Sequence, residues 1–130
     1  MRNIKIQTAS ILISGMILFL IGCYKDKTLP SKPAEITRTV TFSGDIIPIF
    51  NKSCNISGCH SAGGQVPNLT AANAYNSLTV GSYYNTNDPE SSLLYLKVTG
   101  QDSPPMPPSG VNQDYAALIL AWITQGAKNN

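Results

Sequence analysis

The sequence is poor in the residue types that bind metal ions. Its 130 residues include one histidine, three cysteines and three methionines. A site that needs two imidazoles from one chain is therefore excluded. The sequence also lacks a long apolar run: the stretch from Ile11 to Gly22 is shorter than the roughly 20 residues that a membrane-spanning helix requires. We therefore expect no transmembrane protein, and no internal repeat suggests a repeat architecture.

A strong charge of either sign is missing as well. The formal net charge is +2, and without Arg2 and Lys5 the chain has seven basic and seven acidic residues. A balanced surface of this kind does not provide the basic face that nucleic-acid binding needs. We expect no nucleic-acid partner.

The first 22 residues have the pattern of a secretory signal. A basic start with Arg2 and Lys5 leads into an apolar stretch that ends on Leu-Ile-Gly before Cys23. This ending resembles the lipobox of bacterial lipoproteins, which implies lipidation of Cys23. Several acyl chains on one residue give stable attachment, so we expect an exported protein anchored to a bacterial membrane, on the periplasmic side or at the cell surface. The alternative is a cleaved protein that is freely secreted.

The rest of the chain divides into two parts. Residues 23–40 contain two prolines and show no periodicity, so we expect a lipidated, disordered tether. Residues 41–130 are enough for one small domain. Helical signals predict an all-α domain with about four short helices. We expect them at 45–53, capped by Asp45 or Ser43, at 71–78, capped by Thr70, at 88 to about 100, and after a cap at Asn112 up to Gly126.

Residues 54–60 read Cys-Asn-Ile-Ser-Gly-Cys-His. Two thiols followed directly by a histidine are the order that covalent haem attachment requires, with Cys54 and Cys59 forming thioethers and His60 binding the iron. Four residues separate the cysteines instead of the usual two. The same spacing also permits a disulfide-closed loop. A zinc site with Cys54, Cys59 and His60 lacks an evident fourth ligand.

Met106 is the candidate for the second axial ligand. If the leader is removed, the chain keeps one histidine and one methionine, which lies in the run Ser-Pro-Pro-Met-Pro-Pro. The prolines restrict the backbone around Met106 and reduce the entropy lost when its sulfur binds iron. Histidine and methionine ligation raises the reduction potential. The alternative is an exposed polyproline II loop that happens to contain a methionine.

Taken together, the short helix before the cysteines, the Pro67-Asn68-Leu69 turn, the Met-Pro-Pro loop and a terminal Trp-Ile-x-x-Gly-Ala helix resemble a class I, single-haem cytochrome c domain. The resemblance covers residues 42–128 and is closest to small bacterial lipoprotein cytochromes. It implies that the Pro67 carbonyl accepts a hydrogen bond from the ligand histidine, that Leu69 faces the ring edge, and that Phe50 and Trp122 lie near the crossing of the first and last helices.

The expected function is that of a membrane-anchored one-electron carrier with one covalent haem c, and not that of an enzyme; its redox partner proteins are not identifiable from the sequence. Two alternatives remain. An open-site haem sensor or enzyme would leave Met106 unbound, although no distal histidine exists to assist it. A haem-free surface lipoprotein would join Cys54 to Cys59 in a disulfide and use the loop around Tyr83 and Tyr84 as a binding face.

Overall fold

The computed structural model describes residues 33–130, and within this range it contains helices and no β-strand. The prediction of an all-α domain with four short helices is confirmed for this part of the chain. The predicted signal at 1–22, the lipidation site Cys23 and most of the predicted tether lie outside the described residues. In chain order the elements are η1, a π-helical turn (Phe42–Ile46), α2 (Ile47–Ser53), α3 (Ala74–Val80), η2, a 3-10 turn (Pro89–Ser91), α4 (Leu93–Thr99) and α5 (Gln113–Thr124).

The first helix begins earlier than predicted, because its cap is Thr41 and not Ser43 or Asp45. The Thr41 hydroxyl accepts a hydrogen bond from the Gly44 N–H, and the Asp45 carboxylate accepts one from the Thr41 N–H at 2.8 Å. The Asp45 carboxylate, which lies in the first turn, therefore provides the hydrogen-bond acceptor for the backbone N–H of the cap residue. Pro48 lies in the first turn of α2, where its missing N–H and its ring are tolerated.

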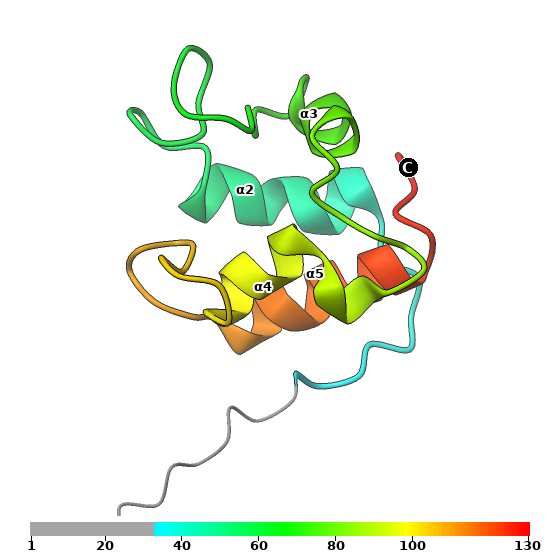
Figure 1. Ribbon diagram of the computed structural model, residues 1–130. Helices are drawn as coiled ribbons and strands as arrows, with labels where there is room; N and C mark the ends of the chain where they lie inside the picture. The colour runs from blue at the N-terminus through cyan, green and yellow to red at the C-terminus, as the bar shows by residue number, and fades with distance from the viewer. Residues whose placement is uncertain (1–32) are drawn as a thin grey trace, which may run out of the picture. The chain divides into compact units, whose positions relative to one another are not determined.

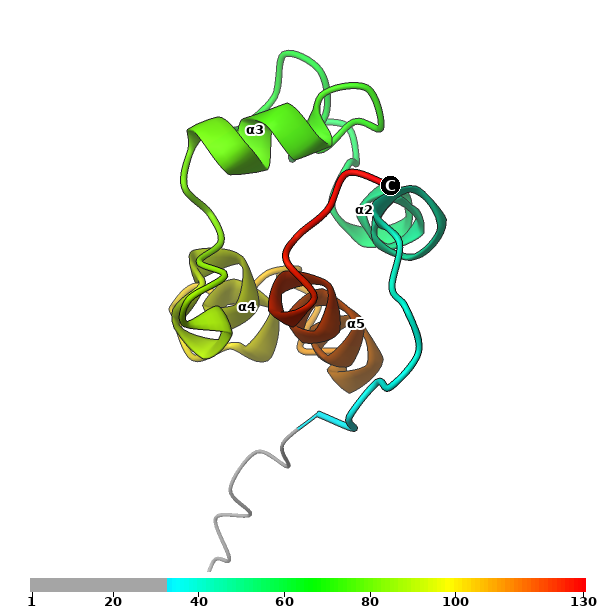
Figure 2. The same ribbon diagram turned by 90° about the vertical axis from the view of Figure 1, so that its right-hand side faces the viewer.

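The fold is built on α2, which continues from η1, and on α5, which contacts η1, η2 and α4. Both are seen along their length in Figure 1 and close to end-on in Figure 2, whereas α3 shows the reverse and so runs across them. Phe50 and Trp122 are both fully buried in the same core. The ring that joins them is Phe42 of η1, whose centroid lies 5.1 Å from Trp122 and 6.2 Å from Phe50. The expected aromatic contact between the first and last helices is thus made through Phe42.

Two further helix starts differ from the prediction. Helix α3 begins at Ala74, three residues later than expected, because Asn68 accepts hydrogen bonds from the Thr70 N–H and hydroxyl and holds the segment before α3 in turns. The predicted helix from Asp88 is divided into η2 and α4, because Ser92 between them has an extended backbone, with ψ 128°. The end of α4 at Gly100, in the left-handed conformation with φ 73°, agrees with the prediction.

Helix α5 has the predicted beginning and end. The Asn112 side chain accepts hydrogen bonds from the N–H groups of Asp114 and Tyr115. Gly126, with φ 96°, follows the last turn as a left-handed residue. The buried face of the helix includes Ile119, Trp122 and Ile123. The cap, the amphipathic repeat and the terminal glycine all mark the same bounds for this helix.

Residues 33–40 form no helix or strand, yet their last part is attached to the helical core. Val40 is buried, and its N–H donates to the Gln125 side chain at 2.9 Å. The Gln125 amide in turn donates to the Arg38 carbonyl, and the Arg38 guanidinium pairs with Asp45 at 2.7 Å. The end of the predicted tether therefore packs against the start of η1 and the end of α5.

Candidate functional site

Two loops far apart in the sequence enclose a small cavity. One follows α2 and the other joins α4 to α5, and both project on the same side of the domain, on the left in Figure 1. The cavity has a volume of about 70 Å³. The residues that line it are Ser53, Cys54, Cys59, His60, Gln65, Met106, Pro107 and Pro108. The structure thus brings both thiols, the imidazole and the thioether predicted from the sequence to one cavity.

The backbone of residues 54–60 folds back on itself. The Cys54 N–H donates to the Phe50 carbonyl at the end of α2, and the His60 N–H donates to the Cys54 carbonyl at 3.1 Å. A third bond, from the Cys59 N–H to the Ile56 carbonyl, closes the turn. Gly58, with φ 81°, adopts the left-handed conformation that this turn needs. The four-residue spacing is therefore accommodated by a closed loop at the carboxyl end of α2.

Both cysteines of this loop are free thiols and are partly buried. Burial, and to a smaller extent the neighbouring Cys59, raises the pKa of the Cys54 thiol from its ordinary value of 9.0 to about 11. At neutral pH Cys54 is consequently a protonated, weakly nucleophilic thiol. A thiol in this state is not activated as a nucleophile or as a thiolate ligand.

The His60 ring is fixed by the Pro67 backbone. The distance between His60 Nδ1 and the Pro67 carbonyl oxygen is 3.0 Å. A carbonyl oxygen only accepts, so Nδ1 must carry the proton in this contact, and a neutral His60 then has its lone pair on Nε2. The Leu69 N–H donates to the His60 carbonyl at 2.8 Å and ties the turn to the same residue. Nε2 is the nitrogen that remains available for a metal.

Leu69 itself is buried in the hydrophobic core, and neither Leu69 nor Pro67 is among the residues that line the cavity. Pro67 contributes through its carbonyl alone. This is the contact that the resemblance implies for Pro67, while the implied position of Leu69 against a ring edge stays a prediction.

Met106 is half-buried and is held by α4. Its N–H donates to the Lys97 carbonyl at 2.9 Å, and the Lys97 ammonium donates to the carbonyls of Ser103 and Pro104 and pairs with Asp102 at 3.1 Å. Sequence reasoning missed Lys97. A lysine in the last turn of a helix was a partial signal, since such residues commonly bind carbonyl groups at the helix end, although here the carbonyls belong to the following loop. Ser53 and Gln65 were also missed, because no motif marks them.

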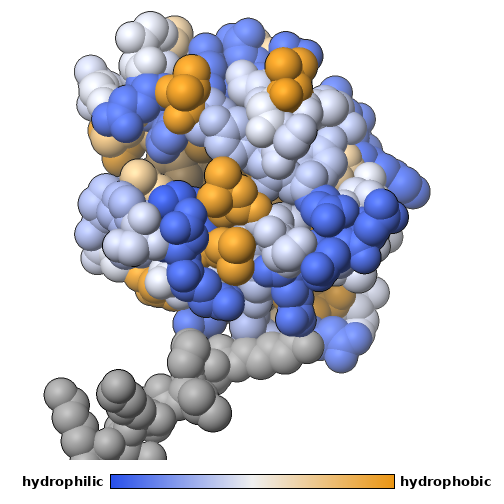
Figure 3. Space-filling model, in the orientation of Figure 1, coloured by the Kyte–Doolittle hydropathy of each residue, from blue (hydrophilic) through white to orange (hydrophobic). Residues whose placement is uncertain are grey.

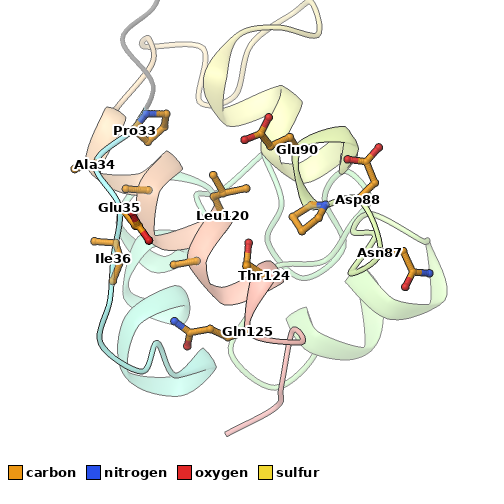
Figure 4. Close-up of a pocket in the computed structure, with 13 residues that line it drawn as sticks. Pro33, Ala34, Glu35, Ile36, Asn87, Asp88, Glu90, Leu120, Thr124 and Gln125 are labelled. Atoms are coloured by element: carbon orange, nitrogen blue, oxygen red, sulfur yellow. The ribbon is translucent and has the colours of Figure 1, made fainter.

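A larger groove lies elsewhere on the domain. It has a volume of about 640 Å³ and lies between residues 33–36, η2 and α5, with Glu35, Asp88, Leu120 and Gln125 among its lining residues (Figure 4). None of the site residues predicted from the sequence lines it. Within residues 33–130, no group of three or more His, Cys, Asp or Glu side chains is arranged to hold a metal ion.

The chain matches no protein-family model, no curated protein and no solved structure. In the described part of the chain, no helix is both long and apolar enough to cross a membrane.

Proposed function

We propose that this protein is a one-electron carrier that holds a single c-type haem through Cys54 and Cys59, with His60 and Met106 as the axial ligands. One observation carries the proposal. Residues of the segment 54–60 and Met106, the only methionine outside the first 22 residues, lie in separate loops but line the same cavity. The hydrogen bond from His60 to Pro67 adds independent support.

The donor set fits a haem of this type. The pair of thiols supplies the covalent bonds, an imidazole with a free Nε2 supplies one ligand, and a thioether supplies the other. The cavity volume is small by comparison, because sites for larger organic ligands have volumes of about 300 Å³ or more. The loops on either side, which have no regular secondary structure, must therefore separate to admit the macrocycle.

The covalent haem would supply a reversible one-electron couple at the iron. The residues of the chain have positioning roles. Pro67 keeps the proton on Nδ1 of His60 and orients the ring, which leaves Nε2 as the nitrogen that would bind iron. Lys97 holds the Met106 loop against α4. A ligand set held from both sides changes little with oxidation state, as an electron carrier requires.

We further propose that the protein is exported and acts at a membrane surface, anchored through lipid on Cys23. The Leu-Ile-Gly-Cys sequence and the basic, apolar leader support this location. Compartments outside the cytoplasm are also the places where covalent haem attachment and disulfide formation occur. Redox proteins near the same membrane are then the expected partners.

The proposed function is tested by producing the protein in a bacterium that has the machinery for covalent haem attachment. We expect a red protein whose mass includes one haem and whose pyridine haemochrome spectrum is that of a c-type haem. The double variant Cys54→Ser/Cys59→Ser should lose the covalent link, whereas Cys23→Ser should keep the haem and lose only lipidation. A colourless product whose mass is two hydrogens below that of the polypeptide with both thiols reduced would instead establish the disulfide-closed lipoprotein.

A further inference from the structure

The two loops that form the candidate site are free of charged residues. Residues 53–87 contain no Asp, Glu, Lys or Arg, and neither do residues 103–113. Every residue that lines the cavity belongs to one of these two runs. We call residues 54–69 and 103–112 the uncharged rim. The side chains of these two loops thus lack the fixed charges that commonly orient a redox encounter.

The charges closest in sequence to the rim are compensated. Lys97 and Asp102 form an ion pair of 3.1 Å, and the remaining donors of Lys97 are directed to loop carbonyls. Lys52 and Asp114, which adjoin the two runs, have opposite signs. Without residues 1–22 the whole chain has seven basic and seven acidic residues. Neither the rim nor the chain as a whole therefore has a strong field of one sign.

The rim also exposes apolar side chains. Val66 is 81% exposed, Ile56 49% and Val111 43%, and these are three of the five large hydrophobic residues that are exposed in the described chain. The face drawn in Figure 3 has apolar groups separated by hydrophilic ones. Single exposed apolar residues are ordinary on a protein surface, but here three of them belong to the two loops that line the cavity.

We infer that the uncharged rim is the docking surface of this protein, and that its redox partner presents an uncharged, partly apolar face to it. The inference rests on the proposed function. A charged partner face would lose hydration against the rim without gaining ion pairs, which disfavours such a complex. An uncharged face loses little hydration and buries apolar area against Val66, Ile56 and Val111. Encounters are then not steered by charge, so their rate depends little on salt.

Electron self-exchange tests the inference, because a second copy of this chain presents a face of the stated chemistry. The measurement uses NMR line broadening in a mixture of ferric and ferrous haem-loaded protein. Between roughly 0.01 M and 0.5 M salt, where screening strengthens severalfold, we expect the self-exchange rate to change by less than about threefold. A rate that rises tenfold or more over this range would overturn the inference, because it would reveal like-charge repulsion at the docking surface.

A matched pair of variants locates the surface. Val66→Lys places a charge on the rim, and Val80→Lys places the same charge at the end of α3, where the native valine is 75% exposed. We expect Val66→Lys to slow self-exchange severalfold at low salt, and we expect the rate to recover at high salt. The self-exchange rate of Val80→Lys should stay close to that of the unmodified protein. Equal effects of the two variants would overturn the inference. Haem content is measured first, so a protein without haem would contradict the proposed function separately from the docking surface.

Discussion

His60 and Met106 differ in how the protein holds them. The ring of His60 is oriented through a side-chain contact to the Pro67 carbonyl, whereas Met106 is held through its backbone N–H and the surrounding loop. The thioether itself is therefore freer to move than the imidazole. We therefore expect the position of the Met106 sulfur to depend more than that of the imidazole on the loop that surrounds it.

Replacement of Met106 tests its role directly. In Met106→Ala we expect covalent haem to be retained, the sulfur-to-iron absorption band to disappear and the reduction potential to fall by about 0.1 V or more, a fraction of the ~0.8 V range that axial ligands span. Voltammetry and the visible spectrum provide the measurements. Val111→Ala, in the same loop but outside the cavity lining, is the control. An unchanged potential and band in Met106→Ala would rule out this ligand.

Cys54 provides a prediction for the haem-free protein. Because the pKa of its thiol is raised to about 11, mainly by burial, little thiolate exists near neutral pH. In folded protein made without the attachment machinery, alkylation of Cys54 by iodoacetamide should be slow at pH 8 and should accelerate steadily up to about pH 11. Mass spectrometry of peptides gives the rates, and the unfolded chain in denaturant is the reference. Equal rates in the folded and unfolded states would contradict the burial of this thiol.

Among the elements, the start of η1 depends on Asp45. The Arg38 side chain, and then the Thr41 backbone N–H, lower the pKa of Asp45 from 3.8 to about 2. Since the folded-state pKa lies below the ordinary value, ionised Asp45 stabilises the fold above about pH 4. This contribution is lost as the pH falls from about 4 to about 2.

Asp45→Asn should therefore reduce the free energy of unfolding near pH 7 by about 1 kcal/mol, a typical net contribution of one hydrogen bond, because the charged acceptor for Arg38 and the Thr41 N–H is lost. Over the acid range its stability should decline less than that of the unmodified protein. Urea unfolding followed by circular dichroism at several pH values measures both effects. Arg38→Met, which removes the main cause of the lowered pKa, should reproduce part of the change. Parallel acid declines in the Asp45→Asn and unmodified proteins would exclude the proposed linkage.

The elements also indicate what local sequence is able to predict. Helix α5 was predicted at both ends, because the Asn112 cap, the apolar repeat and Gly126 all act within one segment. The predicted start of α4 was too early, because the break at Ser92 depends on the loop that precedes it in the chain. The Ser92 hydroxyl accepts a hydrogen bond from the Asn85 N–H, and the Leu94 N–H donates to the Tyr83 carbonyl. Contacts of this kind leave no periodic signal.

The same distinction applies to the site. The order of Cys54, Cys59 and His60 predicted a local loop, and composition indicated Met106, since no other methionine lies outside the first 22 residues. Lys97, Ser53 and Gln65 were not predicted, because their roles arise only when the two loops meet.

For the domain as a whole, the difference from the sequence prediction lies at its beginning. Residues up to 40 were expected to be a tether because they lack periodicity, but an extended segment needs no periodicity when a side chain elsewhere pairs with its backbone. Gln125 has this role, accepting from the Val40 N–H and donating to the Arg38 carbonyl. It closes the domain by joining the segment before η1 to the residue that follows α5.

Removal of that connection should weaken the whole domain. In Gln125→Ala the backbone groups of Arg38 and Val40 lose their partner, and since Val40 is buried, we expect the free energy of unfolding to fall by about 1–2 kcal/mol. Gln113→Ala, an exposed glutamine at the other end of α5, is the matched control and should change stability little. Chemical unfolding of the full-length variants gives the comparison. Equal stabilities of the two variants would contradict this role of Gln125, because its bonds to the segment before η1 would then contribute nothing measurable to the stability of the domain.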